Sequence, residues 1–387
     1  MEDDPCLVVE YTDPEEGFQG WLVIDNLSYP LSAGGMRVQP GITMDHLIKM
    51  ARNMTMKMRL CGLPMDGAKC GIDYNPSSPG KRLAMTRFLQ AIKPYIRTCY
   101  SMGPDLNTDM EELETIASSL EIPSIKMAIA QAQGFELAYF MERYQVLDQE
   151  AMDGWPLGTI RAGYGVAAAA LATLDHLGIT NSQARVAIQG FGTLAKAAAI
   201  GLHQAGVKIV AMSDAEKCLT TKDDELPIQQ LLTRQGVLLP DQDELSGSID
   251  QSSSQELLAH SCDLLVLAAI ENTVTKENCT AIKARAVVPG ANLAVSPEAE
   301  VMLLQRNIPV LPCAMAGCGG SLSMNGLFGP DDHPAPGQVL DYIEKKMSAM
   351  VHQVLQISQE KKITPSQAAL EICDSAKNIS RDKPYAV

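Results

Sequence analysis

Two lysines, Lys57 and Lys69, lie twelve positions apart in the stretch MTMKMRLCGLPMDGAKCG, residues 54–71. Lys57 stands in an apolar run, and Lys69 closes a small-residue turn that begins at Asp66. Burial lowers the pKa of a lysine and a neighbouring cation lowers it further, so one of the pair can act as a general base near neutral pH. The other, fully charged, can hold a substrate carboxylate. The alternative is a pair of solvated lysines beside a turn, since lysine is usually exposed.

Two further features in the first half of the chain could serve such a site. Asp105 lies in the loop SMGPDLNT, residues 101–108, before an acidic helix expected at 109–120. It is either a helix cap or a proton acceptor near Lys69. The pair Gly34–Gly35 permits positive φ or close approach of a ligand, and the alternative is an ordinary turn.

A second type of chemistry is indicated beyond residue 185. The pattern predicts a buried strand at 186–190, a turn GFGTLA, a helix to 205 and a strand at 207–212 that leads to Asp214. Such a turn brings backbone N–H groups to a pyrophosphate at a helix N-terminus, and the terminal acid binds a ribose. From Gly190 to Asp214 is 24 residues (214 − 190), close to the roughly 20 expected. The predicted contacts are Gly190, Phe191, Gly192, Thr193, Leu194 and Asp214.

Three more strands are expected at 264–268, 286–288 and 310–311, each followed by small or polar residues. Ligands of an open parallel sheet bind at the carboxyl ends of its strands. Ala269 and Asn292 are therefore candidate cofactor contacts, and the alternative for Asn292 is a turn asparagine.

The whole chain has 387 residues, enough for two domains, with 46% apolar residues and a net charge of −15. The charge argues against a nucleic-acid partner, and no membrane span is apparent. The acidic N-terminus lacks the features of a signal peptide, and the ten cysteines include no CxxC pair. We expect a cytoplasmic protein without disulfides or a bound metal. A segment rich in Gly, Trp and Pro at 151–159 predicts a hinge between domains.

Taken in order, these features resemble the glutamate/leucine/phenylalanine/valine dehydrogenase family. The matching features are GGMR at 34–37, Lys57, the turn PMDGAKCG at 64–71, Asp105, GYGV at 163–166, the nucleotide fingerprint and GAN at 290–292. The resemblance implies an α/β fold with an N-terminal catalytic and oligomerisation domain at 1–150 and a Rossmann NAD-binding domain at 151–339. The C-terminal helices, within 340–387, would pack back on the first domain, and the protein would form a homo-oligomer.

The resemblance also implies the reaction, a reversible oxidative deamination of an L-amino acid to a 2-oxo acid and ammonia with NAD or NADP. Lys57 would bind the α-carboxylate, Lys69 would activate water, and Asp105 would relay protons. Asp214 favours NAD over NADP because it would repel a 2′-phosphate, although Lys208 and Lys217 lie close in sequence.

Two positions bear on the substrate. Family members that use glutamate carry a lysine before the glycine pair Gly34–Gly35 and a serine after a second one; here these positions hold Ala33 and Met324. Because a buried γ-carboxylate without a partner is costly, we expect an apolar or aromatic amino acid, with glutamate as the alternative.

Three departures from the family pattern surround the reacting centre. Asp66 replaces a glycine and is expected to raise the pKa of Lys69; Ala162, beside Arg161, replaces a threonine; and Gly317 replaces an asparagine. They indicate a specialised enzyme or, alternatively, a nucleotide-binding regulatory homologue with weakened catalysis.

Overall fold

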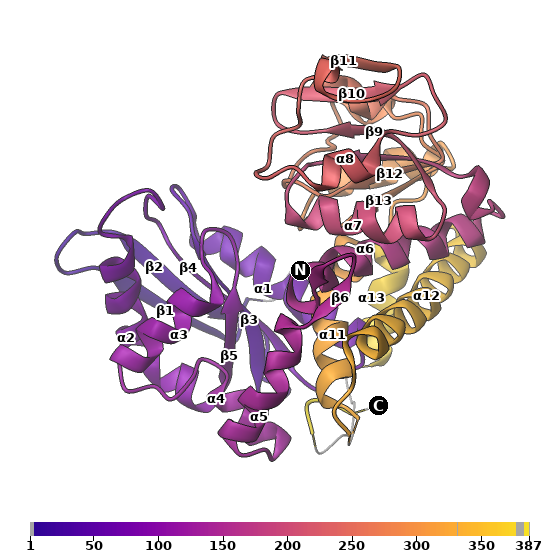
Figure 1. The fold of residues 1–387 in the computed structure, drawn as a ribbon. Coiled ribbons are helices and arrows are strands. Elements are labelled where there is room, and N and C mark those ends of the chain that lie inside the picture. Colours follow the sequence, from indigo (N-terminus) through magenta and orange to yellow (C-terminus); the bar gives the residue numbers. More distant parts are fainter. Residues whose placement is uncertain (1–3, 331, 377–382, 387) are drawn as a thin grey trace. The chain divides into compact units, whose positions relative to one another are not determined.

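The computed structural model of the chain describes residues 4–330, 332–376 and 383–386. It divides into two compact units (Figure 1). Of the described residues, the first unit contains 4–143, 373–376 and 383–386, and the second contains 144–330 and 332–372. The borders predicted for functional domains, at 150/151 and 339/340, stay predictions.

The first unit is a five-stranded mixed sheet in the order β1-β2-β4-β3-β5, with helices around it (Figure 1). Strand β3 is parallel to β4 and to β5, and β4 is antiparallel to β2, so β4 lies inside the sheet. The strands are β1 (Leu7–Thr12), β2 (Gln19–Ile24), β3 (Ser32–Val38), β4 (Asp66–Ile72) and β5 (Tyr100–Pro104), and the helices are α1 (Met44–Leu60), α2 (Lys81–Thr98), α3 (Met110–Ser119), α4 (Met127–Gln133) and α5 (Leu137–Tyr144).

Two glycine-rich stretches are strands, although a turn was expected for the segment that starts at Asp66 and was the alternative for Gly34–Gly35. Gly34 and Gly35 lie inside β3, and the segment that starts at Asp66 is the fully buried strand β4. A Cβ on Gly34 would come within 1.7 Å of the carbonyl oxygen of Ala68 in β4. The small residues therefore allow close approach of neighbouring strands, and neither stretch is a turn.

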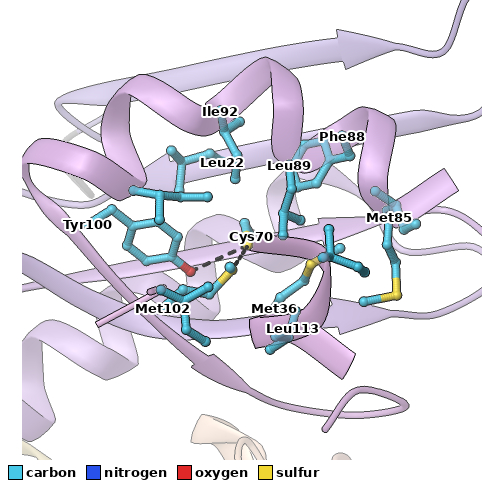
Figure 2. Packing of buried hydrophobic residues seen from close by; sticks show 14 of the residues in the cluster. Leu22, Met36, Cys70, Met85, Phe88, Leu89, Ile92, Tyr100, Met102 and Leu113 are labelled. Atoms are coloured by element: carbon cyan, nitrogen blue, oxygen red, sulfur yellow. Dashed lines mark hydrogen bonds between the residues drawn. The ribbon is translucent and has the colours of Figure 1, made fainter. Parts of the chain in front are cut away.

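Side-chain alternation along β4 sorts its residues onto two faces. Ala68, Cys70 and Ile72 point into the core beneath α2, and Lys69 lies on the opposite face. Figure 2 shows the Tyr100 hydroxyl directed at the sulfur of Cys70, a contact of 3.4 Å. The face that carries Lys69 is the one on which α1 packs, since a Cβ on Gly67 would meet the helix backbone.

Helix α1 begins at a threonine cap. The Thr43 side chain accepts a hydrogen bond from the backbone of His46, and Lys57 lies in the last turn. The chain returns to this unit at its C-terminal end, where the Gln133 amide exchanges two hydrogen bonds with the backbone of Tyr385.

The second unit contains a six-stranded sheet in the order β11-β10-β9-β8-β12-β13 (Figure 1). Strands β9, β8, β12 and β13 are parallel, as the nucleotide fingerprint requires. The strands are β8 (Arg185–Gln189), β9 (Lys208–Ser213), β10 (Lys217–Thr221), β11 (Ile249–Ser253), β12 (Leu264–Leu267) and β13 (Ala286–Pro289), with a separate hairpin of β6 (Glu150–Met152) and β7 (Trp155–Pro156). The helices are α6 (Leu157–His176), α7 (Thr193–Gln204), α8 (Ile228–Leu232), α9 (Pro297–Gln305), α10 (Cys313–Ala316), α11 (Gly319–Phe328) and α12 (Pro336–Lys361), and α13 (Pro365–Ser375) crosses the border between the units. Short 3₁₀ helices lie at η1 (Gln145–Asp148), η2 (Asn181–Gln183), η3 (Gln242–Glu244), η4 (Ser254–Ala259) and η5 (Cys279–Ala281).

Two details of this sheet differ from expectation. The antiparallel strands β10 and β11 extend it beyond β9, which the sequence pattern did not indicate. The strand expected at 310–311 is reduced to one bridge between Val287 and Val310.

Helix α6 lies inside the second unit, where it packs on α7, α11 and α12. Among the described residues it is the one helix long and apolar enough to cross a membrane. Since 67% of its most apolar window is buried inside the protein, it is a core helix here.

Candidate active site

Lys69, Asp105 and Arg37 meet on one face of the first unit's sheet. Asp105 directly follows β5, and its Oδ2 forms an ion pair with the Lys69 ammonium. The Arg37 Nε donates to the same Oδ2 at 3.1 Å. Arg37 lies on β3 and Lys69 on the adjacent strand β4, so parallel pairing brings both cations to the end of β5.

The lysines are not surface residues, because Lys57 is 7% exposed and Lys69 4%. Burial lowers the pKa of Lys69, and the charges of Arg37 and Lys57 lower it further, while Asp105 opposes the shift. Burial raises the pKa of Asp105, but the charges of Lys69 and Arg37 outweigh it and hold that pKa well below its usual range. The cluster therefore combines an ionised carboxylate with an amine that releases its proton more readily than a free lysine.

Asp105 is not a helix cap. Asp109 occupies the cap position of α3, where its carboxylate accepts from the backbone of Glu112. The backbone N–H of Asp105 donates to the Thr108 hydroxyl at 3.0 Å, which fixes the loop.

Three residues predicted to contact the substrate lie beside this cluster. Ala33, Gly34 and Gly35 follow one another along β3 and are paired with β5. A Cβ on Gly35 would lie 3.0 Å from the Cβ of Asp105. Glycine at this position therefore lets the Asp105 side chain sit directly against the strand.

Asp66 does not act on Lys69, contrary to expectation. Residues three apart on a strand point to opposite faces. The Asp66 carboxylate instead accepts from Arg59 Nη2 at 2.7 Å and from the backbone of Tyr29 at 2.8 Å. Burial raises the pKa of Asp66. This substitution is therefore part of a buried structural ion pair.

In the second unit the glycine-rich turn joins β8 to α7. Gly190 adopts φ +109°, and a Cβ there would lie 2.9 Å from a carbonyl oxygen. Gly192 caps α7 without a side-chain hydrogen bond, and the space around its missing Cβ is open. Thr193 is exposed and Leu194 half-buried at the first helical positions. This helix start leaves backbone donors for a phosphate.

Phe191 contributes backbone rather than ring to this turn. Its ring is buried, and the Lys196 ammonium lies 4.2 Å from the ring centroid. Lys196 also donates to the carbonyl oxygens of Arg234 and Gly236 at 2.7 and 2.9 Å.

Two polar atoms that sequence reasoning missed lie at the ends of the adjacent strands β8 and β9. Gln189 Oε1 and Ser213 Oγ are buried, and neither has a hydrogen-bond partner among the described residues. A buried polar group without a partner is costly, so these atoms are suited to a polar ligand at the carboxyl edge of the sheet. A polar residue that ends an apolar strand is the signal from which they were predictable.

Asp214 is buried and already engaged by backbone donors. Its Oδ1 accepts from the N–H groups of Glu216 and Lys217 at 2.7 and 2.8 Å, and its Oδ2 from that of Leu239 at 2.5 Å. The carboxylate therefore holds the turn between β9 and β10, and its contact with a ribose stays a prediction.

The remaining predicted residues also lie in the second unit. Ala269 is exposed after β12, and Asn292 is half-buried after β13. Met324, on α11, accepts at its sulfur from Arg161 Nη1 at 3.1 Å, and the same nitrogen donates to the Ser323 hydroxyl at 3.0 Å. The Arg161 guanidinium thus lies beside Met324, the position expected to favour an apolar substrate, and the sequence alone did not predict this contact.

Comparison with known families accounts for most of the chain. Residues 5–121 match the Glu/Leu/Phe/Val dehydrogenase dimerisation domain, and residues 158–374 match the glutamate/leucine/phenylalanine/valine dehydrogenase model. The chain belongs to this family. It is therefore placed among nicotinamide-dependent amino acid dehydrogenases, which are enzymes.

Individual relatives are distant. A glutamate dehydrogenase of Thermotoga maritima is 28% identical over 376 residues, which are 92% of this chain and 83% of the relative. The hetero-hexameric glutamate dehydrogenase of Thermus thermophilus in its leucine-bound form has a TM-score of 0.76 at 24% identity, over 97% of this chain and 89% of that one. The L-tryptophan dehydrogenase of Nostoc punctiforme has a TM-score of 0.61 at 16% identity, over 97% and 96%. At these identities the solved structures of family members establish the fold, with a dimerisation domain followed by a Rossmann-like domain.

Proposed function

We propose that this protein catalyses the reversible oxidative deamination of an L-amino acid to its 2-oxo acid and ammonia. The observation that carries the proposal is the largely buried cluster of Lys69, Asp105 and Arg37 with Lys57 close by. A structural ion pair does not need two additional cations that are largely removed from water, because desolvating each one costs free energy. A site that binds a carboxylate and moves protons uses all of them.

The first unit supplies the groups that act on the amino acid. The charged Lys57 ammonium pairs with the α-carboxylate. Among the described residues no donor reaches Oδ1 of Asp105, so this oxygen accepts from the substrate amino group. Neutral Lys69 takes a proton from the water that attacks the imine carbon, and it later returns that proton to the departing ammonia.

The second unit supplies the groups that fit a dinucleotide. The uncapped start of α7, the open space at Gly192 and the orphan Ser213 Oγ suit a pyrophosphate and its sugars. When bound, the nicotinamide ring accepts the hydride from the substrate Cα. We propose NAD over NADP because Asp214 places a carboxylate at the end of β9, where it would repel a 2′-phosphate.

We propose an apolar or aromatic amino acid as the substrate. Ala33 and Met324 carry no charge at the two positions where glutamate-using members hold a lysine and a serine. Burying an apolar side chain contributes about 25 cal/mol per Å², whereas an unpaired buried carboxylate costs several kcal/mol.

Glutamate is the second candidate, and one observation favours it. Arg161 places a guanidinium 3.1 Å from the sulfur of Met324, and among the described residues it has no acidic partner. Such a cation suits a second substrate carboxylate. The names of the relatives described above are glutamate dehydrogenase and L-tryptophan dehydrogenase, so they include both classes of substrate.

A panel of the twenty L-amino acids with NAD and with NADP at alkaline pH tests the proposal. We expect reduced cofactor to form with an apolar or aromatic substrate at the highest kcat/KM and with NAD. If glutamate ranks first and Arg161→Met abolishes its use, the second candidate is correct. If no amino acid reduces either cofactor, the protein is a regulatory homologue rather than a working dehydrogenase. We also propose that the protein forms a homo-oligomer, and light scattering of the same preparation measures its molar mass.

A further inference from the structure

Asp105 carries two cations on one of its oxygens. The Lys69 ammonium and Arg37 Nε both contact Oδ2, and these side chains are 5% and 11% exposed. Among the described residues no donor reaches Oδ1. One oxygen is therefore committed to cations, and the other is left for a ligand.

The two cations differ in their chemistry. A guanidinium stays charged at every pH at which the protein is folded, whereas a buried amine can lose its proton. If Lys69 is the base, it is neutral during part of each turnover. Without another cation, Asp105, whose side chain is 20% exposed, would then be a largely buried carboxylate with no charge partner, which is costly.

We propose that Arg37 is a positioning residue that keeps a permanent positive charge on Oδ2 of Asp105 while the Lys69 amine gives up and regains its proton. The inference rests on the proposed role of Lys69 as the base. It adds a residue that contacts neither water nor substrate in this scheme and acts through Asp105.

Arg37 is itself held in place. It lies on β3 opposite Gly71 of β4, on the same face of the sheet as Lys69. Its Nη1 donates to the Gln39 side chain at 3.1 Å while its Nε faces Asp105. The guanidinium is thus fixed between two acceptors, and a flexible surface arginine would not show this geometry.

The other titratable groups near Lys69 do not provide this charge. Cys70 and Tyr100 lie on the core side of the sheet, and burial raises the pKa of each, that of Cys70 to about 12, so both are neutral. Lys57, on α1, lowers the pKa of Lys69 but is proposed to hold the substrate carboxylate. Arg37 is therefore the permanent cation that Asp105 keeps when Lys69 is neutral.

The pH dependence of kcat/KM tests the role. Activity rises with pH as Lys69 loses its proton. Replacing Arg37 by glutamine removes a neighbouring positive charge, so the pKa of Lys69 rises and the acidic limb moves to higher pH by on the order of one unit. Arg37→Lys restores the charge and should return the limb toward its parental position. Gln39→Leu keeps the charge as well and should leave the limb in place.

Arg87→Gln is the matched control, because Arg87 also pairs with a buried carboxylate in this unit, that of Asp13, and with the more exposed Glu16. It should lower the melting temperature and leave the limb unchanged. If Arg37 had only a structural role, Arg37→Gln would likewise lower the melting temperature and leave the acidic limb of the pH profile unchanged.

A second readout does not depend on turnover. With ¹³C at the lysine Cε, NMR titration follows Lys69, whose signal is the one missing in Lys69→Ala. We expect a higher Lys69 pKa in Arg37→Gln than in the parent. An unshifted Lys69 titration in folded Arg37→Gln overturns the inference. If that variant does not fold, a shifted titration in folded Arg37→Lys or Gln39→Leu overturns it instead. A parent without turnover refutes the proposed function alone, since the NMR result still decides the role of Arg37.

Discussion

The buried pair of Arg59 and Asp66 yields a prediction whose size follows from its geometry. Arg59 Nη2 lies 2.7 Å from Asp66 Oδ1, and the side chains are 4% and 0% exposed. Arg59 also stacks over the Tyr29 ring at 4.6 Å, and its Nη1 is buried without a hydrogen-bond partner among the described residues. Asp66→Ala would leave a buried guanidinium with no charge partner.

Breaking one partner of a buried ion pair costs about 3–5 kcal/mol. For a unit of this size each kcal/mol lowers the melting temperature by about 2–4 °C, so we expect a fall of about 6–20 °C. The matched control in the same unit is Glu15→Ala, because the Glu15 carboxylate is 67% exposed where it pairs with Arg87. Exposed pairs contribute about 0–1 kcal/mol.

Tryptophan fluorescence can follow this unit alone. The chain has two tryptophans, Trp21 in β2 and Trp155 in β7. In a Trp155→Phe background, thermal unfolding reports the sheet that contains Asp66. The double variant Arg59→Met, Asp66→Ala should recover much of the loss, since an apolar pair can replace a buried ion pair.

The reasoning is refuted if Asp66→Ala lowers the melting temperature of this unit no more than Glu15→Ala does. It is also refuted if the double variant is less stable than Asp66→Ala. A third contradictory result is a shifted acidic limb in Asp66→Gly, because it would mean that Asp66 acts on Lys69 after all.

Three further predictions concern binding, cofactor choice and pH. Lys57→Ala should raise KM for the amino acid about 10–100-fold with a smaller change in kcat, because it removes a cation that pairs with the α-carboxylate in the ground state as well as in the transition state. Steady-state kinetics measure KM and kcat separately, and a loss confined to kcat would contradict this role. Asp214→Ala should lower the ratio of the NADP to the NAD dissociation constant, which calorimetry measures, and an unchanged ratio would mean that Asp214 plays no part in cofactor choice. The same variant should be less stable, because three backbone N–H groups lose their acceptor. Burial raises the pKa of Asp13, but hydrogen bonds from Arg87 and the backbone lower it to about 2, so its stabilising contribution is present above pH 4 and is lost as pH falls toward 2. The melting temperatures of parent and Asp13→Asn should therefore converge over that range, and a constant difference would contradict the assignment.

Much of the architecture was predictable from local patterns. The fingerprint with its Asp214 matched β8, α7 and β9 within one or two residues, because buried strands and an alanine-rich helix carry strong signals. Thr43 and Asp109 are of the residue types typical of helix starts, because each side chain supplies an oxygen that accepts from a backbone N–H of the first turn.

The strands at the candidate active site were not predictable in this way. Strand β4, DGAKCGI, is buried on both faces and built from small residues, so it shows neither apolar alternation nor β-branched enrichment. Its glycines indicated a turn, whereas their role is close packing. If the segment were a turn, Asp66 would lie near Lys69. Because it is a strand, the two side chains point to opposite faces, and Asp66 pairs with Arg59 instead.

Side-chain contacts between residues far apart in the chain were also not predictable from the sequence. Arg37 and Asp105 are 68 residues apart, and Arg161 and Met324 are 163 apart. Parallel strand order and helix packing bring them together, and one sequence contains no local signal for either. The GGMR motif drew attention to Arg37, but its contact with Asp105 required the register of β3 and β5.

The central claim is that Lys69 is the base of a working amino acid dehydrogenase. The most direct test compares cofactor reduction by the parent and by Lys69→Ala, each with the best amino acid of the panel, while calorimetry measures binding of that amino acid and of NAD to both proteins. We predict that turnover falls by on the order of 10²–10⁴ while both ligands still bind, because the lost group acts in the transition state. Near-parental turnover in Lys69→Ala would contradict the account.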